Sequence, residues 1–235
     1  MTHAVPKSAR LVEARELAPE IRHFVFEVPG LDRLPFEPGQ FVSLRRSIGS
    51  EHITRAYSIA SAPDGGRFEL CLNLVPNGPF SHFLFGLRPG DEVEFDGPLG
   101  YFLLRRPVRD SLFVATGTGI APIRSMITHL LAEGSSARLQ LLFGARHPET
   151  LLYRDEFGAL AVRHPNFTFQ PTLSRPPESW TGLRGRVQRH LFDALAGRTA
   201  VDVYVCGLKT MVNDVRARLK DAGFDRRSII YEKYD

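Results

Sequence analysis

The stretch Leu112-Phe113-Val114-Ala115-Thr116-Gly117-Thr118-Gly119-Ile120-Ala121-Pro122 joins an apolar run to a glycine-rich turn and the start of an apolar helical segment. An unbroken apolar run is typical of a strand buried in a parallel sheet. Pro122 suits the first turn of the helix that follows, where its missing amide hydrogen has no partner to lose. Backbone amides in the turn can then approach a pyrophosphate group. The stretch therefore predicts a strand, a loop and a helix that together bind a nucleotide.

Strand and helix patterns alternate through the rest of the C-terminal half. Apolar runs predict strands at 112–115, 139–143, 167–170, 201–205 and 229–231. Helical patterns lie between them at 120–131, 151–162, 187–195 and 209–222. Alternation of this kind predicts a doubly wound α/β fold with a parallel five-stranded sheet. Residues 174–185 are expected to form one long surface loop.

The N-terminal half follows a different pattern. Short runs rich in Val, Phe and Leu are separated by turn signals such as Pro38-Gly39, Asp64-Gly65-Gly66 and Pro89-Gly90-Asp91. This spacing is typical of an antiparallel barrel. The change of pattern falls near Arg106-Pro107, so we expect two domains, at residues 1–106 and 107–235.

Composition narrows the class of protein. The chain has 235 residues, of which 43% are hydrophobic and 24% charged, enough for one large or two small cores. It has no apolar run of about 18 residues and no secretory signal, so a cytoplasmic protein is expected. The net charge of +4 comes from scattered arginines, which fit either a solvated surface or an acidic protein partner.

The cysteine count limits the metal chemistry of the chain. Cys71 and Cys206 are too few for an iron–sulfur cluster, and they lie in predicted strands of different domains, which argues against a disulfide. No metal site, membrane contact or nucleic-acid contact is predicted. Any iron–sulfur cluster must therefore belong to a separate molecule.

The run Arg55-Ala56-Tyr57-Ser58 places a cation, an aromatic ring and a hydroxyl group in one strand-like segment. Side chains alternate along a strand, so Arg55 and Tyr57 project to one side and Ser58 to the other. The arginine can pair with a pyrophosphate, the ring can pack on a flavin, and the hydroxyl group can bond near its reactive nitrogen. An ordinary strand is the alternative.

The segment Gly78-Pro79-Phe80-Ser81 follows the apolar run 68–75 and precedes a second apolar run, 83–87. Ser81 is placed as the N-cap of a short helix. A helix start presents unpaired amides and a partial positive charge, so this segment suits a cofactor phosphate.

Together with Pro38-Gly39-Gln40-Phe41-Val42, Gly97-Pro98-Leu99-Gly100 and Tyr204-Val205-Cys206-Gly207-Leu208-Lys209, these motifs in this order resemble the ferredoxin–NADP reductase family over nearly the whole chain. The resemblance implies a Greek-key β-barrel that holds FAD and an α/β domain that holds NAD(P). The residues that it assigns to FAD are Arg55, Ala56, Tyr57, Ser58, Leu72, Asn73, Leu74, Gly78, Pro79, Phe80, Ser81 and Tyr234.

The resemblance also implies a coenzyme site. It assigns the dinucleotide loop to Gly117, Thr118, Gly119 and Pro122, and the nicotinamide side to Cys206 and Gly207, whereas Lys209 and Asp214 are expected to be exposed helix positions without a role. Ser174 and Arg175 match the pair that grips the 2′-phosphate of NADP, with Arg184 or Arg186 as a second cation. Arg186 also replaces the adenine-stacking tyrosine of plant-type relatives, and NAD-using oxygenase reductases share the Ser-Arg pair. NADP is favoured, and NAD stays open.

The C-terminus Tyr231-Glu232-Lys233-Tyr234-Asp235 resembles the family pattern of a glutamate followed two residues later by an aromatic ring that covers the flavin. The resemblance thus assigns the catalytic roles to Ser58, Cys206, Glu232 and Tyr234. Asp235 is one residue more than the pattern has.

The resemblance implies an oxidoreductase that moves electrons between NADPH and a one-electron carrier, ferredoxin or flavodoxin, through FAD, and that acts as a monomer. Three alternatives stay open at this point. They are an NAD(P)H:flavin reductase, an NADH-dependent reductase component of an oxygenase, and a non-catalytic nucleotide-binding regulatory subunit.

Overall fold

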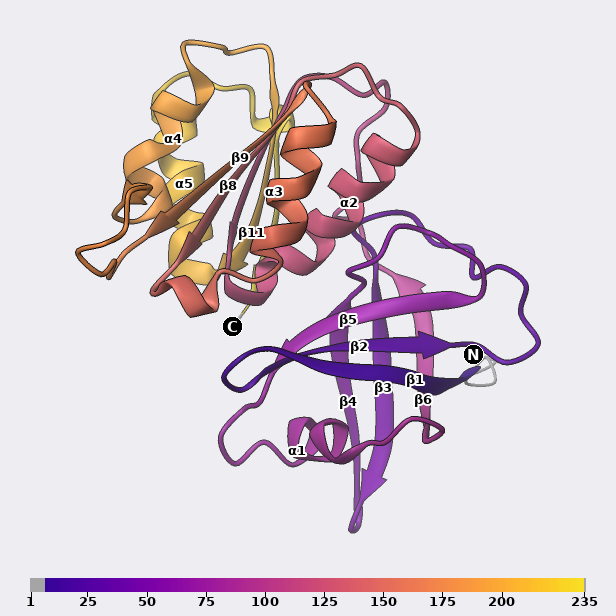
Figure 1. Cartoon of the computed structure of the whole chain (residues 1–235). Helices are drawn as coiled ribbons and strands as arrows, with labels where there is room; N and C mark the ends of the chain where they lie inside the picture. The colour runs from indigo at the N-terminus through magenta and orange to yellow at the C-terminus, as the bar shows by residue number, and fades with distance from the viewer. Residues whose placement is uncertain (1–6, 235) are drawn as a thin grey trace.

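The computed structural model describes residues 7–234 and contains two sheets, each with its own hydrophobic core (Figure 1). The N-terminal sheet is antiparallel, with the strand order β4-β3-β6-β1-β2-β5. Its elements are β1 (Lys7–Ala18), β2 (Ile21–Glu27), β3 (Phe41–Ile48), β4 (Glu51–Ser58), β5 (Arg67–Asn73), α1 (Pro79–Gly86) and β6 (Glu92–Leu99).

The edges of this sheet meet, so it forms a barrel. Ile59, just after β4, forms a bridge with Leu70 of β5, and the amide of Ala60 donates to the carbonyl of Glu69 at 2.7 Å. Strand β6 returns to lie between β1 and β3, which is a Greek-key connection. Alternate residues of β5, such as Phe68 and Leu70, are fully buried inside the barrel. The predicted Greek-key β-barrel is confirmed.

The second sheet is parallel, with the order β10-β9-β8-β7-β11-β12. Helices α2 and α3 lie on one face and α4 and α5 on the other (Figure 1). The bounds are β7 (Ser111–Thr116), α2 (Ile120–Ala132), β8 (Leu139–Ala145), α3 (Arg154–Arg163), β9 (Phe167–Leu173), β10 (Leu183–Arg184), α4 (Val187–Leu195), β11 (Asp202–Leu208), α5 (Lys209–Asp221) and β12 (Ile229–Tyr234).

Two details differ from the sequence prediction. The five predicted strands are present, but a sixth, the two-residue β10, pairs with β9 inside the segment expected to be a loop. Helix α3 begins at Arg154 and not at 151, because residues 148–150 form a separate 3-10 turn and Tyr153 has a left-handed backbone with φ of 56°.

The strand order reverses its direction between β7 and β11. Chain connections run from β7 to β8 and β9 on one side, and from β11 to β12 on the other. Open α/β sheets bind ligands beyond the carboxyl ends of the strands at this switch point. The fold therefore places a crevice where the loop 117–119 follows β7 and where Leu208 ends β11.

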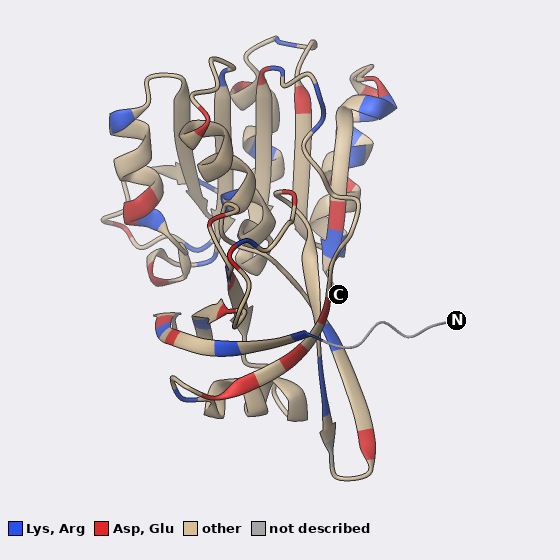
Figure 2. Ribbon diagram, turned by 90° about the vertical axis from the view of Figure 1, so that its right-hand side faces the viewer, with Lys and Arg blue, Asp and Glu red and all other residues tan. Residues whose placement is uncertain are grey.

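The segment between β6 and β7 is anchored to the second sheet. Arg109 donates to the buried carboxylate of Asp202 at 2.6 Å, and the amide of Arg105 donates to the hydroxyl oxygen of Tyr204 at 2.9 Å. The expected domain boundary at 106/107 lies in this segment and stays a prediction. No helix in residues 7–234 is long and apolar enough to cross a membrane. Acidic and basic residues are interspersed over both sheets (Figure 2).

Candidate functional site

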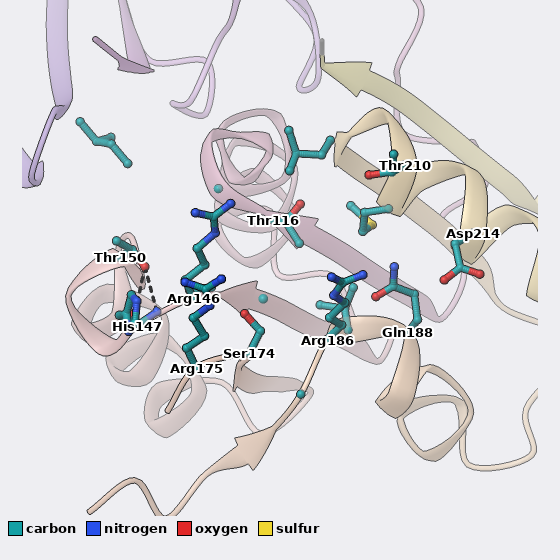
Figure 3. Close-up of a pocket in the computed structure, with 18 residues that line it drawn as sticks. Thr116, Arg146, His147, Thr150, Ser174, Arg175, Arg186, Gln188, Thr210 and Asp214 are labelled. Carbon is teal, nitrogen blue, oxygen red and sulfur yellow. Dashed lines mark hydrogen bonds between the residues drawn. The ribbon is translucent and has the colours of Figure 1, made fainter. Parts of the chain in front are cut away.

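A cavity of 830 Å³ opens at the carboxyl ends of the parallel strands. Residues after β7, β8, β9 and β11 line it, as the switch-point geometry requires (Figure 3). Ile21 also lines it, although it belongs to the barrel. The other lining residues are Thr116, Gly117, Gly144, Ala145, Arg146, His147, Thr150, Ser174, Arg175, Gly185, Arg186, Val187, Gln188, Leu208, Thr210, Met211 and Asp214.

The glycine loop is shaped for close approach by a ligand. Gly117 lines the cavity and has φ of 55°, a conformation that favours glycine. A Cβ on Gly119 would lie 2.6 Å from the carbonyl carbon of Cys206, so the loop packs directly on β11. Thr118 is half-buried in the same turn, and Pro122 is buried in the first turn of α2.

Two buried polar atoms beside this loop have no partner among the described residues. They are Oγ1 of Thr116 and Oε1 of Gln188, and both residues line the cavity. A buried polar atom without a hydrogen bond is costly. The cavity therefore fits a polar ligand that supplies the missing hydrogen bonds, as a dinucleotide can.

Three arginines surround the outer part of the cavity. Arg146 and Arg175 lie with Ser174 on one side, and Arg186 faces them from the start of α4 (Figure 3). All three guanidinium groups belong to exposed residues. Several cations around one hydroxyl group suit a phosphate dianion.

Arg184, the other residue considered for a second cation, does not line the cavity. Its guanidinium donates to the carbonyl oxygens of Pro177, Glu178 and Trp180, which braces the loop before β10. The geometry favours Arg186 for the role. Asp214 was expected to be an exposed position without a role, but it is half-buried and lines the cavity, whereas Lys209 is exposed at the start of α5.

Arg146 was missed by the sequence analysis. It directly follows β8, which ends at Ala145. The rule that ligands bind beyond the carboxyl ends of the strands would have singled it out.

The four residues assigned catalytic roles meet at one point between the barrel and the α/β domain. The hydroxyl group of Tyr234 donates to Oγ of Ser58 at 2.6 Å, and Ser58 donates to Oε1 of Glu232 at 3.0 Å. Cys206 pairs with Glu232 in the register of β11 with β12, which brings it to the same point. Ser58 ends β4, so residues more than 170 positions apart in sequence form this cluster.

Burial decides the protonation of this cluster. It raises the pKa of Glu232, although the hydrogen bond from Ser58 opposes the change. Burial also raises the pKa of the Cys206 thiol and of the Tyr234 hydroxyl group well above their ordinary values. Cys206 and Tyr234 therefore keep their protons near neutral pH, and Glu232 holds its proton more tightly than a solvated carboxyl group.

Glu232→Gln is expected to raise the melting temperature more at about pH 8 than at about pH 5. The folded protein binds the Glu232 proton more tightly than the unfolded chain does, so the wild type loses stability as pH rises through the raised pKa. Glutamine has no charge to bury and escapes this loss. Thermal unfolding of the variant at both pH values tests this, with exposed Glu178→Gln as the control. A difference that does not grow with pH would contradict the burial argument.

The predicted flavin strand presents Arg55 and Ala56 on the barrel surface, whereas Ser58 at its end is buried. Arg55 is exposed, and its guanidinium donates to the carbonyl of Thr54 at 2.8 Å and has no carboxylate partner within residues 7–234. The ring of Tyr57 stacks on Phe80 of α1, with centroids 6.3 Å apart. Ala56 between them is exposed. A free cation beside an aromatic pair suits a planar cofactor that carries phosphate.

The predicted N-cap at Ser81 is wrong. Helix α1 begins at Pro79 with Gly78 as N-cap, and Ser81 lies inside the first turn. Its Oγ accepts from the amide of Val75 and donates to the carbonyl of Gly78, each at 3.0 Å. The first-turn amides of Phe80 and Ser81 still have no partner from helix geometry, so the helix start keeps its suitability for an anion.

The remaining predicted FAD residues lie near this turn. Leu72 is buried in the barrel core, Asn73 is exposed, and the amide of Leu74 donates to the carbonyl of Glu20. Their contact with FAD stays a prediction, as do the other cofactor contacts. Asp235 lies outside the described residues.

Comparison with known proteins agrees with the two-domain architecture. The family model of the oxidoreductase FAD-binding domain matches residues 8–103, and that of the oxidoreductase NAD-binding domain matches residues 113–217. The ferredoxin–NADP reductase B of Sorangium cellulosum (strain So ce56) is 43% identical over 245 residues, and the match covers 100% of both chains. The chain belongs to the ferredoxin–NADP reductase family. The resemblance seen in the sequence is thus confirmed.

Two further proteins are similar to this chain over nearly its whole length. The toluate 1,2-dioxygenase electron transfer component of Pseudomonas putida is 32% identical over 96% of this chain and 67% of its own length. The crystal structure of a ferredoxin NADP+ reductase from Neisseria gonorrhoeae with bound FAD and NADP has a TM-score of 0.83 and 25% identity, and covers 99% of both chains. The chain is an oxidoreductase with an FAD-binding and an NAD-binding domain.

Proposed function

We propose that this protein transfers electrons between NADPH and a one-electron carrier protein through a bound FAD. The observation that carries the proposal is the meeting of Ser58 from the flavin strand with Cys206, Glu232 and Tyr234 from the α/β domain. The loop 117–119, which is predicted to bind the coenzyme, packs on Cys206. The four residues therefore lie between the two predicted cofactor sites.

Each domain would hold one of the two cofactors. Arg55, Tyr57 and the first turn of α1 would hold FAD, and the loop 117–119 would hold the coenzyme pyrophosphate. FAD, when bound, supplies the conversion between hydride and single-electron transfer. Ser58 would present its hydroxyl group at the flavin edge, and Glu232 and Cys206 would bound the space for the nicotinamide and exclude water from it.

NADPH is proposed over NADH because of the cation group around Ser174. Arg175, Arg186 and Arg146 line the cavity without carboxylate partners among residues 7–234, and the 2′-phosphate of NADPH is the one group by which the two coenzymes differ. The relative from N. gonorrhoeae has bound NADP. The names of the relatives from S. cellulosum and P. putida support an electron-carrier protein as partner.

Ferredoxin is the proposed carrier, with flavodoxin as the other acceptor of the same class. Within residues 7–234 there is no group of three or more His, Cys, Asp or Glu residues that could hold a metal ion. We further propose that the protein acts as a monomer. The reductase component of an oxygenase is the second candidate, supported by the toluate 1,2-dioxygenase relative, and differs mainly in its partner.

The proposal is tested by steady-state assays with NADPH and NADH as donors and with ferredoxin, flavodoxin and free FMN as acceptors. We expect the highest kcat/KM with NADPH and ferredoxin, and FAD that stays bound through purification. Free FMN as the best acceptor would instead identify a flavin reductase, and NADH as the better donor would favour an oxygenase component.

Tyr234→Ser is expected to bind NADP+ about two- to tenfold more tightly, since the wild-type ring would stack on the flavin and would have to give up about 0.5–1.5 kcal/mol when the nicotinamide binds. Turnover should fall, because the oxidised nicotinamide would be held against the flavin. Titration with NADP+ under absorbance detection measures both the affinity and a new charge-transfer band.

Two control variants separate the ring from its hydroxyl group. Tyr234→Phe keeps the ring and loses the bond to Ser58, so its NADP+ affinity should match that of the wild type. Tyr231→Ser removes an exposed ring of the same strand, which lies against Arg216, and should also have no effect. Unchanged affinity in Tyr234→Ser would show that Tyr234 does not cover the flavin.

A further inference from the structure

A buried polar cluster centred on Arg124 joins the barrel to the α/β domain outside the coenzyme cavity. Arg124 lies in α2, and its guanidinium donates to the carboxylate of Glu69 in β5 and, at 2.8 Å, to the carbonyl of Ala60. Both acceptors belong to the barrel. Its Nε donates to Glu156 of α3, in its own domain, at 2.9 Å. The Arg124 side chain is only 13% exposed, so these bonds are shielded from water.

Two neighbours of Arg124 reinforce the contact. Ser125 donates its hydroxyl group to the carbonyl of Ser61, again across to the barrel. The ring of Tyr153 lies 4.7 Å from the guanidinium, and its hydroxyl group hydrogen-bonds Nδ1 of His23 in β2 at 2.9 Å. The left-handed backbone of Tyr153 is unfavourable for any residue but glycine, so the surrounding contacts must hold it in place.

The Arg124 cluster lies within a few residues of each predicted cofactor-binding segment. Ala60 is two residues beyond Ser58, and Arg124 is about one helical turn beyond the loop 117–119 that starts α2. Residues 59 and 60 are held to β5 by the bridge of Ile59 with Leu70 and the bond from the Ala60 amide to Glu69, and α2 is continuous from Ile120 through Arg124. The bond from Arg124 to Ala60 and Glu69 therefore fixes the start of α2, which would carry the coenzyme pyrophosphate, relative to the strand that would carry the flavin.

We propose that Arg124 is a positioning residue for hydride transfer, which sets the distance between the nicotinamide and the flavin through its bonds to Glu69 and Ala60. The proposal rests on the proposed function, because it concerns the approach of the two cofactors. Reaction rates fall steeply with misalignment, and a displacement of about 1 Å can cost about a hundredfold.

The two carboxylates on Arg124 provide a matched pair of variants. Glu69 and Glu156 both accept hydrogen bonds from Arg124 and are 25% and 29% exposed, but only Glu69 lies across the domain contact. Glu69 also lies 3.7 Å from the His23 ring. Burial lowers the pKa of His23 to about 4. Glu69 opposes this shift, whereas Arg124 and Arg15 add to it. His23 is thus neutral at assay pH with or without Glu69, so Glu69→Ala leaves no new charge on it.

Anaerobic stopped-flow mixing of the FAD-loaded enzyme with varied NADPH measures the limiting rate of flavin reduction and the apparent Kd separately. We expect Glu69→Ala to lower the limiting rate about tenfold with Kd within about twofold, and Glu156→Ala to change both by less than about twofold. Arg124→Met should lose more than Glu69→Ala, and Arg124→Lys should recover part of that loss.

Hydrogen exchange gives a readout that needs no turnover. The amides of residues 58–61 and of 120, 121, 123 and 124 should exchange faster in Glu69→Ala than in Glu156→Ala if the cross-domain bond holds these segments together. Arg109→Met, which removes a bond to Asp202 at the far end of β11, controls for loss of stability and should keep the wild-type limiting rate.

Equal limiting rates in Glu69→Ala and Glu156→Ala, with equal exchange, would overturn the positioning role and leave the proposed function standing. A wild type whose FAD is reduced by neither coenzyme would overturn the proposed function and the positioning role with it. If Arg124→Met fails to fold, the glutamate pair decides the question.

Discussion

Arg175→Ala should raise KM for NADPH about tenfold to a hundredfold and leave KM for NADH nearly unchanged, because a charge-assisted hydrogen bond contributes about 1.5–3 kcal/mol. Arg175 lines the cavity beside Ser174, and the 2′-phosphate that it would bind is present only in NADPH. Steady-state kinetics with both coenzymes measure the ratio of the two effects.

A matched control comes from the same region of the chain. Arg189 is exposed at the start of α4 and does not line the cavity, so Arg189→Ala should leave both KM values unchanged. Arg186→Ala should act in the same direction as Arg175→Ala. Equal losses with both coenzymes in Arg175→Ala would indicate a general defect of the loop, and a wild type that prefers NADH would contradict the NADPH assignment.

Arg55→Ala should weaken FAD binding about tenfold to over a hundredfold, on the same reasoning about charge-assisted bonds. Arg55 has an exposed guanidinium with no carboxylate partner in residues 7–234, so its charge is available for a cofactor phosphate. The FAD content after purification and the Kd from fluorescence titration of the apoprotein measure the loss.

Arg67→Ala is the control for loss of a barrel arginine. Arg67 lies at the start of β5 and pairs with Glu27 on the surface of the same barrel. Its loss should leave FAD affinity within about twofold, as is usual for an exposed ion pair. Wild-type FAD affinity in Arg55→Ala would remove Arg55 from the site.

Much of the fold could be predicted because local pattern and tertiary structure agree. Helix α4 begins and ends where its pattern predicted, since its apolar positions face one side of the sheet. The sixth strand could not be predicted, because β10 has two residues and depends on its pairing with β9. Ser81 was misplaced because a serine is a common N-cap, whereas Pro79 at the first helical position is the signal that decides this helix start.

Some residues of the candidate site could be predicted from the sequence, and others could not. Ser58, Cys206, Glu232 and Tyr234 were singled out by family motifs. The fold brings them together through the hydrogen bonds of Ser58 with Glu232 and Tyr234 and the pairing of Cys206 with Glu232. The sequence could not show which of Arg184 and Arg186 lines the cavity, because Arg184 is turned away from it by hydrogen bonds to three loop carbonyls. The Arg124 cluster joins segments more than 50 residues apart, and no local pattern marks it.

The most direct test of the proposed function is a two-step anaerobic stopped-flow experiment on the FAD-loaded protein. NADPH should bleach the flavin absorbance in the first step, and oxidised ferredoxin mixed into the reduced enzyme should restore it in the second. Flavin that NADPH does not reduce, or reduced flavin that neither ferredoxin nor flavodoxin reoxidises, would contradict the account of the protein as a reductase of electron-carrier proteins.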